Sequence, residues 1–201
     1  MGDIEYVPVD ASHAADARTT IARAFAVDPL IEWLFPAEMW KDGERLDHIA
    51  TFYWPSVETY AAQGAGHVAV DGDRVVGVAL WGVPNSGSPA QTLPSASGVA
   101  RLLLGDRLGE LAEGMRVARG DTALPSGPYL HDLAVTADRR GEGIGTALIE
   151  AGLRDFGRNG AWLETTNPRN QGLYERAGFE GVHAGPIGNS GVTMTRMAVP
   201  S

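Results

Sequence analysis

The alternation of apolar and polar positions predicts several β-strands. Residues 4–9 alternate and favour a strand that stops near Pro8. Two further β-rich runs, 67–70 and 74–81, flank Asp71-Gly72-Asp73, which is typical of a hairpin turn. In the second half of the chain, short apolar runs predict strands at 129–136, 161–166, 179–182 and 192–199.

Helical periodicity fills the segments between these runs. Ser12 is placed to cap a helix that continues to about Ala26, where Asp28-Pro29 ends it. The aromatic-rich stretch that follows is expected to be helical in one or two pieces. Spaced leucines predict a helix over 99–119, between expected loops at 82–98 and 120–128. Two more helices are predicted at 143–157 and 168–177.

The order of these elements predicts the fold class. Strand, helix and strand alternate after residue 128, which predicts a sheet covered by helices in an α+β or α/β layered domain. The 201 residues have the length of one domain. Their 44% apolar and 20% charged content is typical of a folded globular protein rather than a disordered one.

Composition and charge exclude several classes of function. The sequence has no cysteine, which excludes disulfides, thiolate metal sites and a cysteine nucleophile, and its scattered histidines lack metal-ligand spacing. The net charge of -9 disfavours a nucleic-acid partner and favours cationic ones such as amines. The apolar runs are shorter than the roughly 20 residues that span a bilayer. The acidic N-terminus is unlike a secretory signal, so we expect no membrane and a cytoplasmic location.

The strand-to-helix segment 133–148 carries the most specific chemistry. An apolar strand runs into a turn with alternating glycines at 141, 143 and 145, and the turn opens a helix. The first amides of a helix attract anions, and glycines let a phosphate approach the backbone. The same glycines would also suit a tight turn without a ligand. A Walker loop and a dinucleotide fingerprint fit worse, because the residues that each requires are missing.

Two motifs follow one another in this half of the chain. The first is Arg140-Gly141-Glu142-Gly143-Ile144-Gly145, and the second runs from Asn170 through Leu173-Tyr174-Glu175 to Gly178-Phe179. They resemble the pyrophosphate motif and the Asn…Leu-Tyr-Glu-x-x-Gly-Phe element of the GNAT superfamily of N-acetyltransferases, in the usual order and with a strand between. The resemblance covers roughly 129–182. The phrases 129–135 and 164–170 resemble the branch that contains puromycin acetyltransferase.

The resemblance implies a fold and a division of the chain. The fold is α+β, with a mixed, largely antiparallel sheet of about six to seven strands flanked by helices. One GNAT-like domain over 1–201 would place the acceptor-side helices and the hairpin in 1–128. The acetyl-CoA-binding core would occupy 129–182, and a C-terminal hairpin strand 183–201. A homodimer is one form of assembly that the resemblance allows.

The implied reaction transfers the acetyl group of acetyl-CoA directly to a primary amine of a small molecule in a ternary complex. Two other interpretations stay open: acetylation of a protein N-terminus or lysine, and an acyl-CoA-binding sensor without turnover. A deep, closed, aromatic pocket would favour a small acceptor. An open groove would favour a protein.

Catalytic roles are implied at four positions. Tyr174 matches the tyrosine that acts as general acid toward the CoA thiolate, with packing of its ring in the core as the alternative. The general base is left open among His131, Asp132, Glu164 and a chain of waters. Because successive strand residues point to opposite faces, we expect at most one of His131 and Asp132 to face the acceptor directly.

The residues expected to bind acetyl-CoA follow from the same matches. The amide of Ala134 is expected to lie nearest the thioester carbonyl. Asn170 is expected to contact the CoA arm or to lie at the surface, and Asn167, before Pro168, to cap the helix. The full set is Leu133, Ala134, Val135, Arg140, Gly141, Glu142, Gly143, Ile144, Gly145, Thr146, Asn170, Leu173 and Tyr174.

Aromatic residues of the first half are candidates for the acceptor pocket, because the family builds acceptor specificity from its N-terminal helices and loops. Trp33, Phe35 and Trp81 are the first choices, with burial in the core as the alternative. Asp28 and Glu32 lie close in sequence and could bind a cation. Solvation at the surface is the simpler explanation for these two carboxylates.

Overall fold

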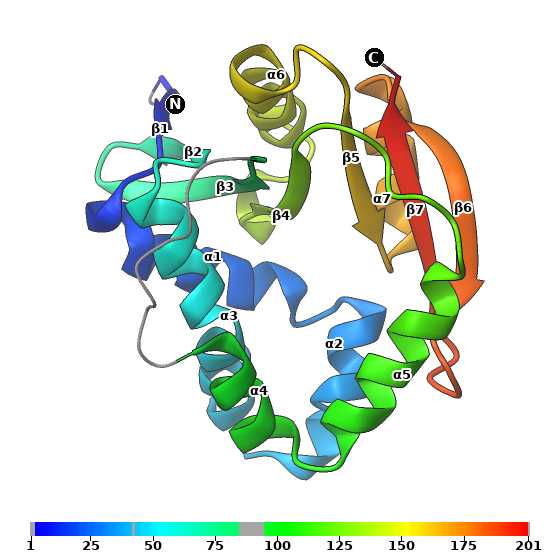
Figure 1. Cartoon of the computed structure of the whole chain (residues 1–201). Coiled ribbons are helices and arrows are strands. Elements are labelled where there is room, and N and C mark those ends of the chain that lie inside the picture. Colours follow the sequence, from blue (N-terminus) through cyan, green and yellow to red (C-terminus); the bar gives the residue numbers. More distant parts are fainter. Residues whose placement is uncertain (1–2, 42, 85–94, 201) are drawn as a thin grey trace.

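A seven-stranded sheet organises the part of the chain that the structure describes, residues 3–41, 43–84 and 95–200 (Figure 1). The structure is a computed structural model, and its strand order is β1-β2-β3-β4-β5-β7-β6. The strands are β1 (Glu5–Pro8), β2 (Gly66–Asp71), β3 (Arg74–Gly82), β4 (Tyr129–Val135), β5 (Ala161–Thr165), β6 (Glu180–Pro186) and β7 (Thr193–Val199).

The strands pair antiparallel except at the centre of the sheet. There β4 and β5 run parallel and pair at two positions, Tyr129 with Trp162 and Leu130 with Leu163. Beyond Leu130 the two strands diverge, and Figure 1 shows them spreading apart. The expected mixed, largely antiparallel sheet is therefore confirmed. The divergence leaves backbone groups of β4 without a strand partner on that side.

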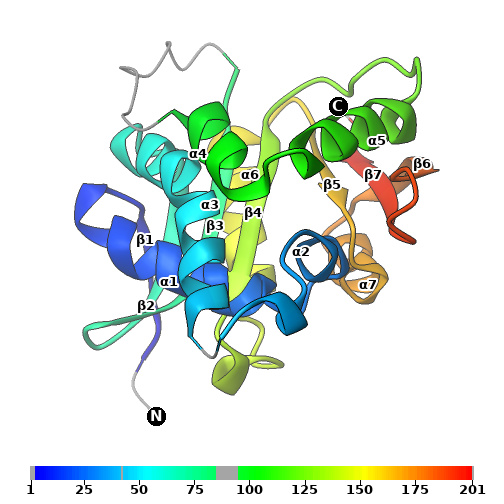
Figure 2. The same ribbon diagram turned by 90° about the horizontal axis from the view of Figure 1, so that it is seen from below.

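Helices cover both faces of the sheet. On β1 to β4, α6 packs against one face, and α1 and α3 pack against the other. Figure 2 shows α2 lying between α1 and α7, and α5 packs against β6 and β7. The helices are α1 (Ala14–Phe25), α2 (Pro29–Leu34), α3 (Glu44–Ala62), α4 (Ala96–Leu104), α5 (Arg107–Arg119), α6 (Ile144–Phe156) and α7 (Pro168–Arg176).

The alternation of side chains along β3 divides the core into two layers. Trp81 packs with Leu148 on the α6 side of the sheet, whereas Leu80 packs with Ile21 on the α1 side. All four side chains are wholly buried. The period of two along a strand explains why neighbours belong to different layers.

Four predictions about element boundaries are corrected. The helix predicted over 99–119 is two helices, since Gly105 has a left-handed φ of +53° and ends α4. Ser95 caps α4, so this helix begins inside the predicted loop 82–98, of which residues 85–94 lie outside the described residues. The first helix begins at Ala14, after a short 3-10 turn that Asp10 rather than Ser12 caps. The strand predicted at 179–182 continues to residue 186, because β6 pairs with β7 over that length.

Candidate active site

Two cavities meet where β4 and β5 diverge. The outer groove has a volume of about 560 Å³ and lies between β4, the turn before α6, and α7. The inner cavity has a volume of about 230 Å³ and lies between β4, β5, α2 and α3. The residues that line both are Phe25, Asp28, Leu133, Asn170 and Tyr174. Molecules bound in the two cavities would touch at this junction.

The turn before α6 shapes the outer groove for an anion. Gly141 and Gly143 have φ values of +83° and +81°, which glycine adopts without strain, and a Cβ at either position would point into open space. The amide of Ala147 bonds to the Gly143 carbonyl, so the amides before Ala147 have no acceptor within the helix. Those amides carry partial positive charge. The turn therefore fits the pyrophosphate that the motif resemblance implies.

The two arginines of this turn have different surroundings. Arg140 is exposed, lines the outer groove and forms no ion pair within the described part of the chain. Arg139 is held by Asp71 and by Glu142, whose Oε2 lies 2.9 Å from the Arg139 Nε. Glu142 was expected among the cofactor-binding residues. Its carboxylate faces Arg139 and does not line the groove, because that ion pair turns it away.

The backbone of β4 decides which amides face the outer groove. Thr136 donates its amide to Val76 of β3 at 2.9 Å, and paired residues on antiparallel strands alternate between bonded and non-bonded pairs. Ala134, two residues earlier, therefore also directs its amide to β3. Leu133 and Val135 direct theirs to the side from which β5 has diverged. This corrects the expectation that the Ala134 amide lies nearest a bound thioester.

The other expected cofactor-binding residues lie where the motifs predict. Asn167 caps α7 as expected, since its Oδ1 accepts a hydrogen bond from the Arg169 amide at 3.1 Å. Asn170 lines both cavities rather than the outer surface. Of the expected cofactor-binding residues, those that line the outer groove are Leu133, Ala134, Val135, Arg140, Gly141, Gly143, Ile144, Gly145, Thr146, Asn170, Leu173 and Tyr174.

Tyr174 stands at the junction of the two cavities. Its side chain is buried, and its ring packs edge-on against Phe179 at a centroid distance of 6.2 Å. Burial raises the pKa of Tyr174 above its usual value, and the nearby charges of Asp28 and Asp132 raise it further. The hydroxyl is therefore protonated at neutral pH and able to donate. The functional and the core-packing interpretations both describe this residue.

A β-bulge in β4 brings His131 and Asp132 together. On β3, Leu80 lies opposite Asp132 and Trp81 opposite Leu130, so His131 is an extra residue in the pairing. His131 and Asp132 both line the inner cavity, and the His131 Nδ1 lies 2.9 Å from the Asp132 Oδ2. The expectation that at most one of them faces the acceptor side is wrong, because the period of two does not hold across a bulge.

These two side chains differ in their access to solvent. The side chain of Asp132 is 2% exposed and that of His131 is 34% exposed. The His131 ring lies near the rings of Tyr60 and Tyr129, at centroid distances of 5.1 and 5.6 Å. Burial lowers the pKa of His131, but the charge and the hydrogen bond of Asp132 together raise it above its usual value. The pair links the buried end of the cavity to solvent.

Glu164 also lines the inner cavity, but two arginines occupy its carboxylate. Its Oε1 accepts a hydrogen bond from Arg196 at 2.8 Å, and its Oε2 accepts one from Arg119 at 2.7 Å. The side chains of Glu164 and Arg196 are 4% and 1% exposed. Arg196 also donates to Thr122 at 2.9 Å. Because both oxygens already accept hydrogen bonds from cations, this geometry favours a structural role over that of a proton acceptor.

Asp28 is a site residue that sequence reasoning placed at the surface. It is the N-cap of α2, and its Oδ1 accepts hydrogen bonds from the Leu30 amide and the Thr166 hydroxyl, both at 3.0 Å. Burial raises the pKa of its carboxyl above the usual value, although these hydrogen bonds act in the opposite direction. The Asp-Pro pair signalled a helix boundary. The contact with Thr166, 138 residues further along the chain, has no local signal.

None of the three aromatic residues chosen for the acceptor pocket lines either cavity. Trp81 faces α6 on the other side of the sheet, and Phe35 is buried in the cluster of α2, α3 and α4. The Trp33 ring lies under the Arg107 guanidinium, 5.2 Å from its carbon. The inner cavity is lined instead by other aromatic and apolar residues: Phe25, Leu30, Ile31, Phe52, Tyr53, Met115 and Tyr129.

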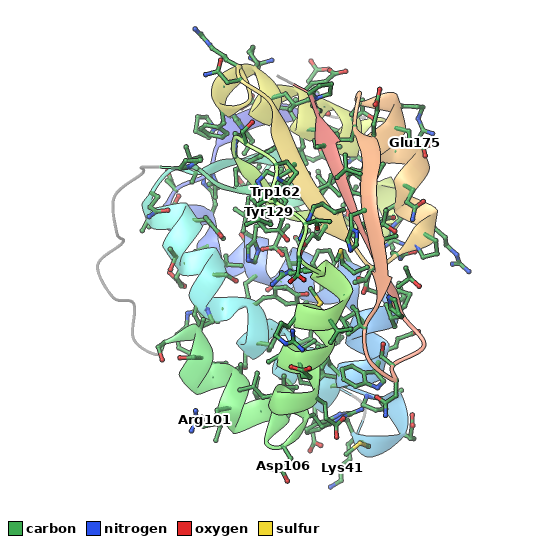
Figure 3. The ribbon with its side chains drawn as sticks, turned by 45° about the vertical axis from the view of Figure 1, so that its right-hand side comes forward. Lys41, Arg101, Asp106, Tyr129, Trp162 and Glu175 are labelled. Carbon is green, nitrogen blue, oxygen red and sulfur yellow. The ribbon has the colours of Figure 1, made fainter. Side chains whose placement is uncertain are left out.

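Ring contacts hold the wall of the inner cavity in place. Tyr53 meets Phe25 and Phe52 edge-to-face, at centroid distances of 5.2 and 5.3 Å. Tyr129 lies against Trp162, at 4.4 Å, where β4 and β5 still pair, and Figure 3 shows these two side by side. The cavity therefore presents a fixed aromatic surface. Such a surface suits an apolar or aromatic ligand.

The described residues hold neither a metal-ligand group nor a membrane-spanning helix. Over 3–41, 43–84 and 95–200, no three His, Asp or Glu side chains are grouped so that they could hold a metal ion. Over the same ranges, every helix is too short or too polar to cross a bilayer.

The fold class is that of the GNAT acetyltransferases. Its marks are a sheet that opens at its central strands, a helix N-terminus that fits an anion, and a tyrosine between two cavities. Residues 104–181 match the family model of the acetyltransferase (GNAT) domain. This match includes both motifs that carry the resemblance, and it supports that resemblance.

Solved acetyltransferase structures share this fold over nearly the whole chain. One from Corynebacterium glutamicum, described as histone acetyltransferase HPA2 and related acetyltransferase, has a TM-score of 0.71 and 23% identity, covering 100% of this chain and 97% of that one. An N-acetyltransferase from Staphylococcus aureus has a TM-score of 0.61 and 17% identity, covering 97% and 100%. The polyamine N-acetyltransferase of Drosophila melanogaster, which forms N-acetylagmatine, has a TM-score of 0.59 and 17% identity, covering 99% and 100%. At these identities the likeness shows the fold.

Proposed function

We propose that this protein transfers the acetyl group of acetyl-CoA to the primary amine of a small molecule. The observation that carries the proposal is the meeting of the outer groove and the inner cavity at Tyr174. The outer groove offers helix amides, Arg140 and free β4 backbone groups to a CoA thioester. The inner cavity offers an aromatic wall and carboxylates to an amine.

The residues at the junction suit direct transfer. The amine nitrogen attacks the thioester carbonyl carbon, so that a C–N bond forms and the C–S bond breaks. Asp132 accepts the proton of the nitrogen, directly or through water, and passes it to His131. Tyr174 donates its hydroxyl proton to the departing sulfur. A β4 amide on the open side, that of Leu133 or Val135, stabilises the oxyanion.

The shape of the inner cavity favours a small acceptor over a protein. Its volume of about 230 Å³ is that of a site for a small molecule, and much of its wall is aromatic or aliphatic. Two proteins of similar fold act on small amines, the polyamine N-acetyltransferase and an agmatine N-acetyltransferase. These observations support the small-molecule interpretation.

Release of the CoA thiol tests this proposal. The purified protein is mixed with acetyl-CoA and a panel of primary amines, and free thiol is followed with a chromogenic disulfide reagent. We expect amine-dependent release that Tyr174→Phe slows without loss of acetyl-CoA binding. Binding of acetyl-CoA with no release for any amine would support the sensor interpretation instead. Preferential acetylation of peptide N-termini or lysines would support a protein acceptor.

A further inference from the structure

Three carboxylates line the two cavities, and they differ in their partners. Asp132 contacts His131, and Glu164 is held by two guanidinium groups. Asp28 receives only neutral donors, the Leu30 amide and the Thr166 hydroxyl, and both bond to its Oδ1. Within the described residues Asp28 forms no ion pair, and its donors, which also include the nearby Ile31 amide, are all neutral. A part-buried negative charge is thus left without a cation.

This charge lies beside the point where an acceptor nitrogen has to react. Asp28 lines both cavities, as does Tyr174. Phe25, Leu133 and Asn170 also line both cavities, so Asp28 belongs to the set of residues around the junction. Its hydrogen bond to Thr166 fixes the carboxylate to the end of β5. An ammonium group bound to the Asp28 carboxylate would therefore lie next to the proposed general acid.

In the described part of the inner cavity, the other two carboxylates already have basic partners, and Asp132 contacts His131. Two residues before Thr166, Glu164 is bonded to Arg119 and Arg196, so this cluster carries two positive charges against one negative charge. The remaining wall is mainly aromatic and aliphatic. A second ammonium group would either lose its water against apolar side chains or approach a net positive cluster, and both are unfavourable.

We propose that Asp28 binds the ammonium group of the acceptor, which then loses one proton to Asp132 before the nitrogen attacks. The acceptor class is a compact monoamine, with one cationic nitrogen on an apolar or aromatic body. The inference rests on the proposed function and names the substrate class of the same site. A charge-assisted hydrogen bond supplies the partner that Asp28 lacks. The ring-lined wall accepts the apolar body. Diamines and longer polyamines are disfavoured by the missing second site.

Matched variants and acceptors test this inference. Asp28→Asn removes the charge but keeps an N-cap oxygen for Leu30, so the fold is preserved. Glu32→Gln removes one charge from the same helix at an exposed position that lines neither cavity, and serves as the control. The acceptors are n-pentylamine, 1,4-diaminobutane and O-butylhydroxylamine, which have the same number of non-hydrogen atoms. They carry one, two and no positive charges at neutral pH.

The expected pattern is specific to a charge contact. Asp28→Asn raises the KM for n-pentylamine by about 10- to 100-fold, as loss of a charged hydrogen bond does, and leaves the KM for acetyl-CoA unchanged. With neutral O-butylhydroxylamine the loss in Asp28→Asn is smaller than with n-pentylamine, because no charge contact is broken. All rates of Glu32→Gln stay within about twofold of wild type, because Glu32 lines neither cavity. Wild type prefers n-pentylamine to 1,4-diaminobutane by about tenfold or more, since the extra ammonium has no partner.

The failures of the two proposals are distinguishable. Equal KM values of Asp28→Asn and Glu32→Gln for n-pentylamine would overturn the role of Asp28, while the acetyltransferase itself stands. Preference of the wild-type protein for the diamine would overturn the monoamine class. Absence of turnover with every acceptor, in protein that binds acetyl-CoA, would overturn the proposed function and this inference with it.

Discussion

Replacing Glu164 by glutamine is expected to destabilise the fold rather than to remove a catalytic base. The change leaves the volume of the side chain unchanged but removes the negative charge that Arg119 and Arg196 share. Arg196 is 1% exposed, and its remaining partners are the Thr122 hydroxyl and the face of Trp162, 5.8 Å from its guanidinium carbon. Its charge would then lie in the interior with no counter-ion.

The structure sets the size of this effect. Breaking a buried ion pair by removing one partner costs about 3–5 kcal/mol. For a chain of this length, each kcal/mol lowers Tm by about 2–4 °C, so Glu164→Gln should lower Tm by about 6–20 °C. Arg119 is about half exposed, and its replacement by methionine should cost at most about 1 kcal/mol. The ion pair between Glu164 and Arg196 therefore carries most of the effect.

Thermal and denaturant unfolding of four proteins measure this effect. They are wild type, Glu164→Gln, Arg196→Met and the double variant. Because the two side chains are in contact, the loss in the double variant should be smaller than the sum of the single losses by about 0.5–3 kcal/mol. At temperatures where Glu164→Gln remains folded, its kcat should stay close to wild type. Wild-type stability combined with a large fall in kcat would refute the structural role and restore Glu164 as a base.

Three further predictions follow from the site and the core. Tyr174→Phe should lower kcat by about 100-fold or more, because the proton donor to sulfur is lost, while calorimetry should show unchanged affinity for acetyl-CoA. An unchanged kcat would exclude Tyr174 as the general acid. Folding raises the pKa of His131, so wild type should be more stable than His131→Asn below pH about 6.5 and should lose this advantage as the pH rises past the raised pKa. Urea unfolding at several pH values measures the difference. A stability difference that does not change with pH would contradict the reasoning. Gly152→Ala would place a Cβ 2.2 Å from the buried Trp81 Nε1 and should cost about 1–3 kcal/mol; wild-type Tm would show that this contact relaxes freely.

The sequence predicted the parts of the site that depend on neighbouring residues in the chain. The glycine turn, the helix that it opens and the Asn167 cap are all local, and the structure has them where the pattern placed them. Tyr174 was placed by its motif, and it lies at the junction of the two cavities. Local turn and cap chemistry needs no tertiary contact to be recognised.

The parts that were missed depend on tertiary pairing. The bulge at His131 arises from the register of β3 against β4, which no periodicity within β4 reveals. The Arg119–Glu164–Arg196 cluster joins three elements, and Asp28 meets Thr166 only once α2 packs beside β5. Trp81 looked available for a pocket because aromaticity alone does not say which face of a strand is buried. The same register that fixes the bulge also sends Trp81 toward α6.

Calorimetric titration of the purified protein with acetyl-CoA, alongside NAD and ATP, tests the central claim most directly. The amides before Ala147, the free Arg140 and the open side of β4 predict saturable one-site binding of acetyl-CoA and no comparable binding of the two controls. No heat of binding for acetyl-CoA with folded protein would mean that the glycine turn serves only the strand-to-helix connection. The proposed acetyltransferase activity would then be contradicted.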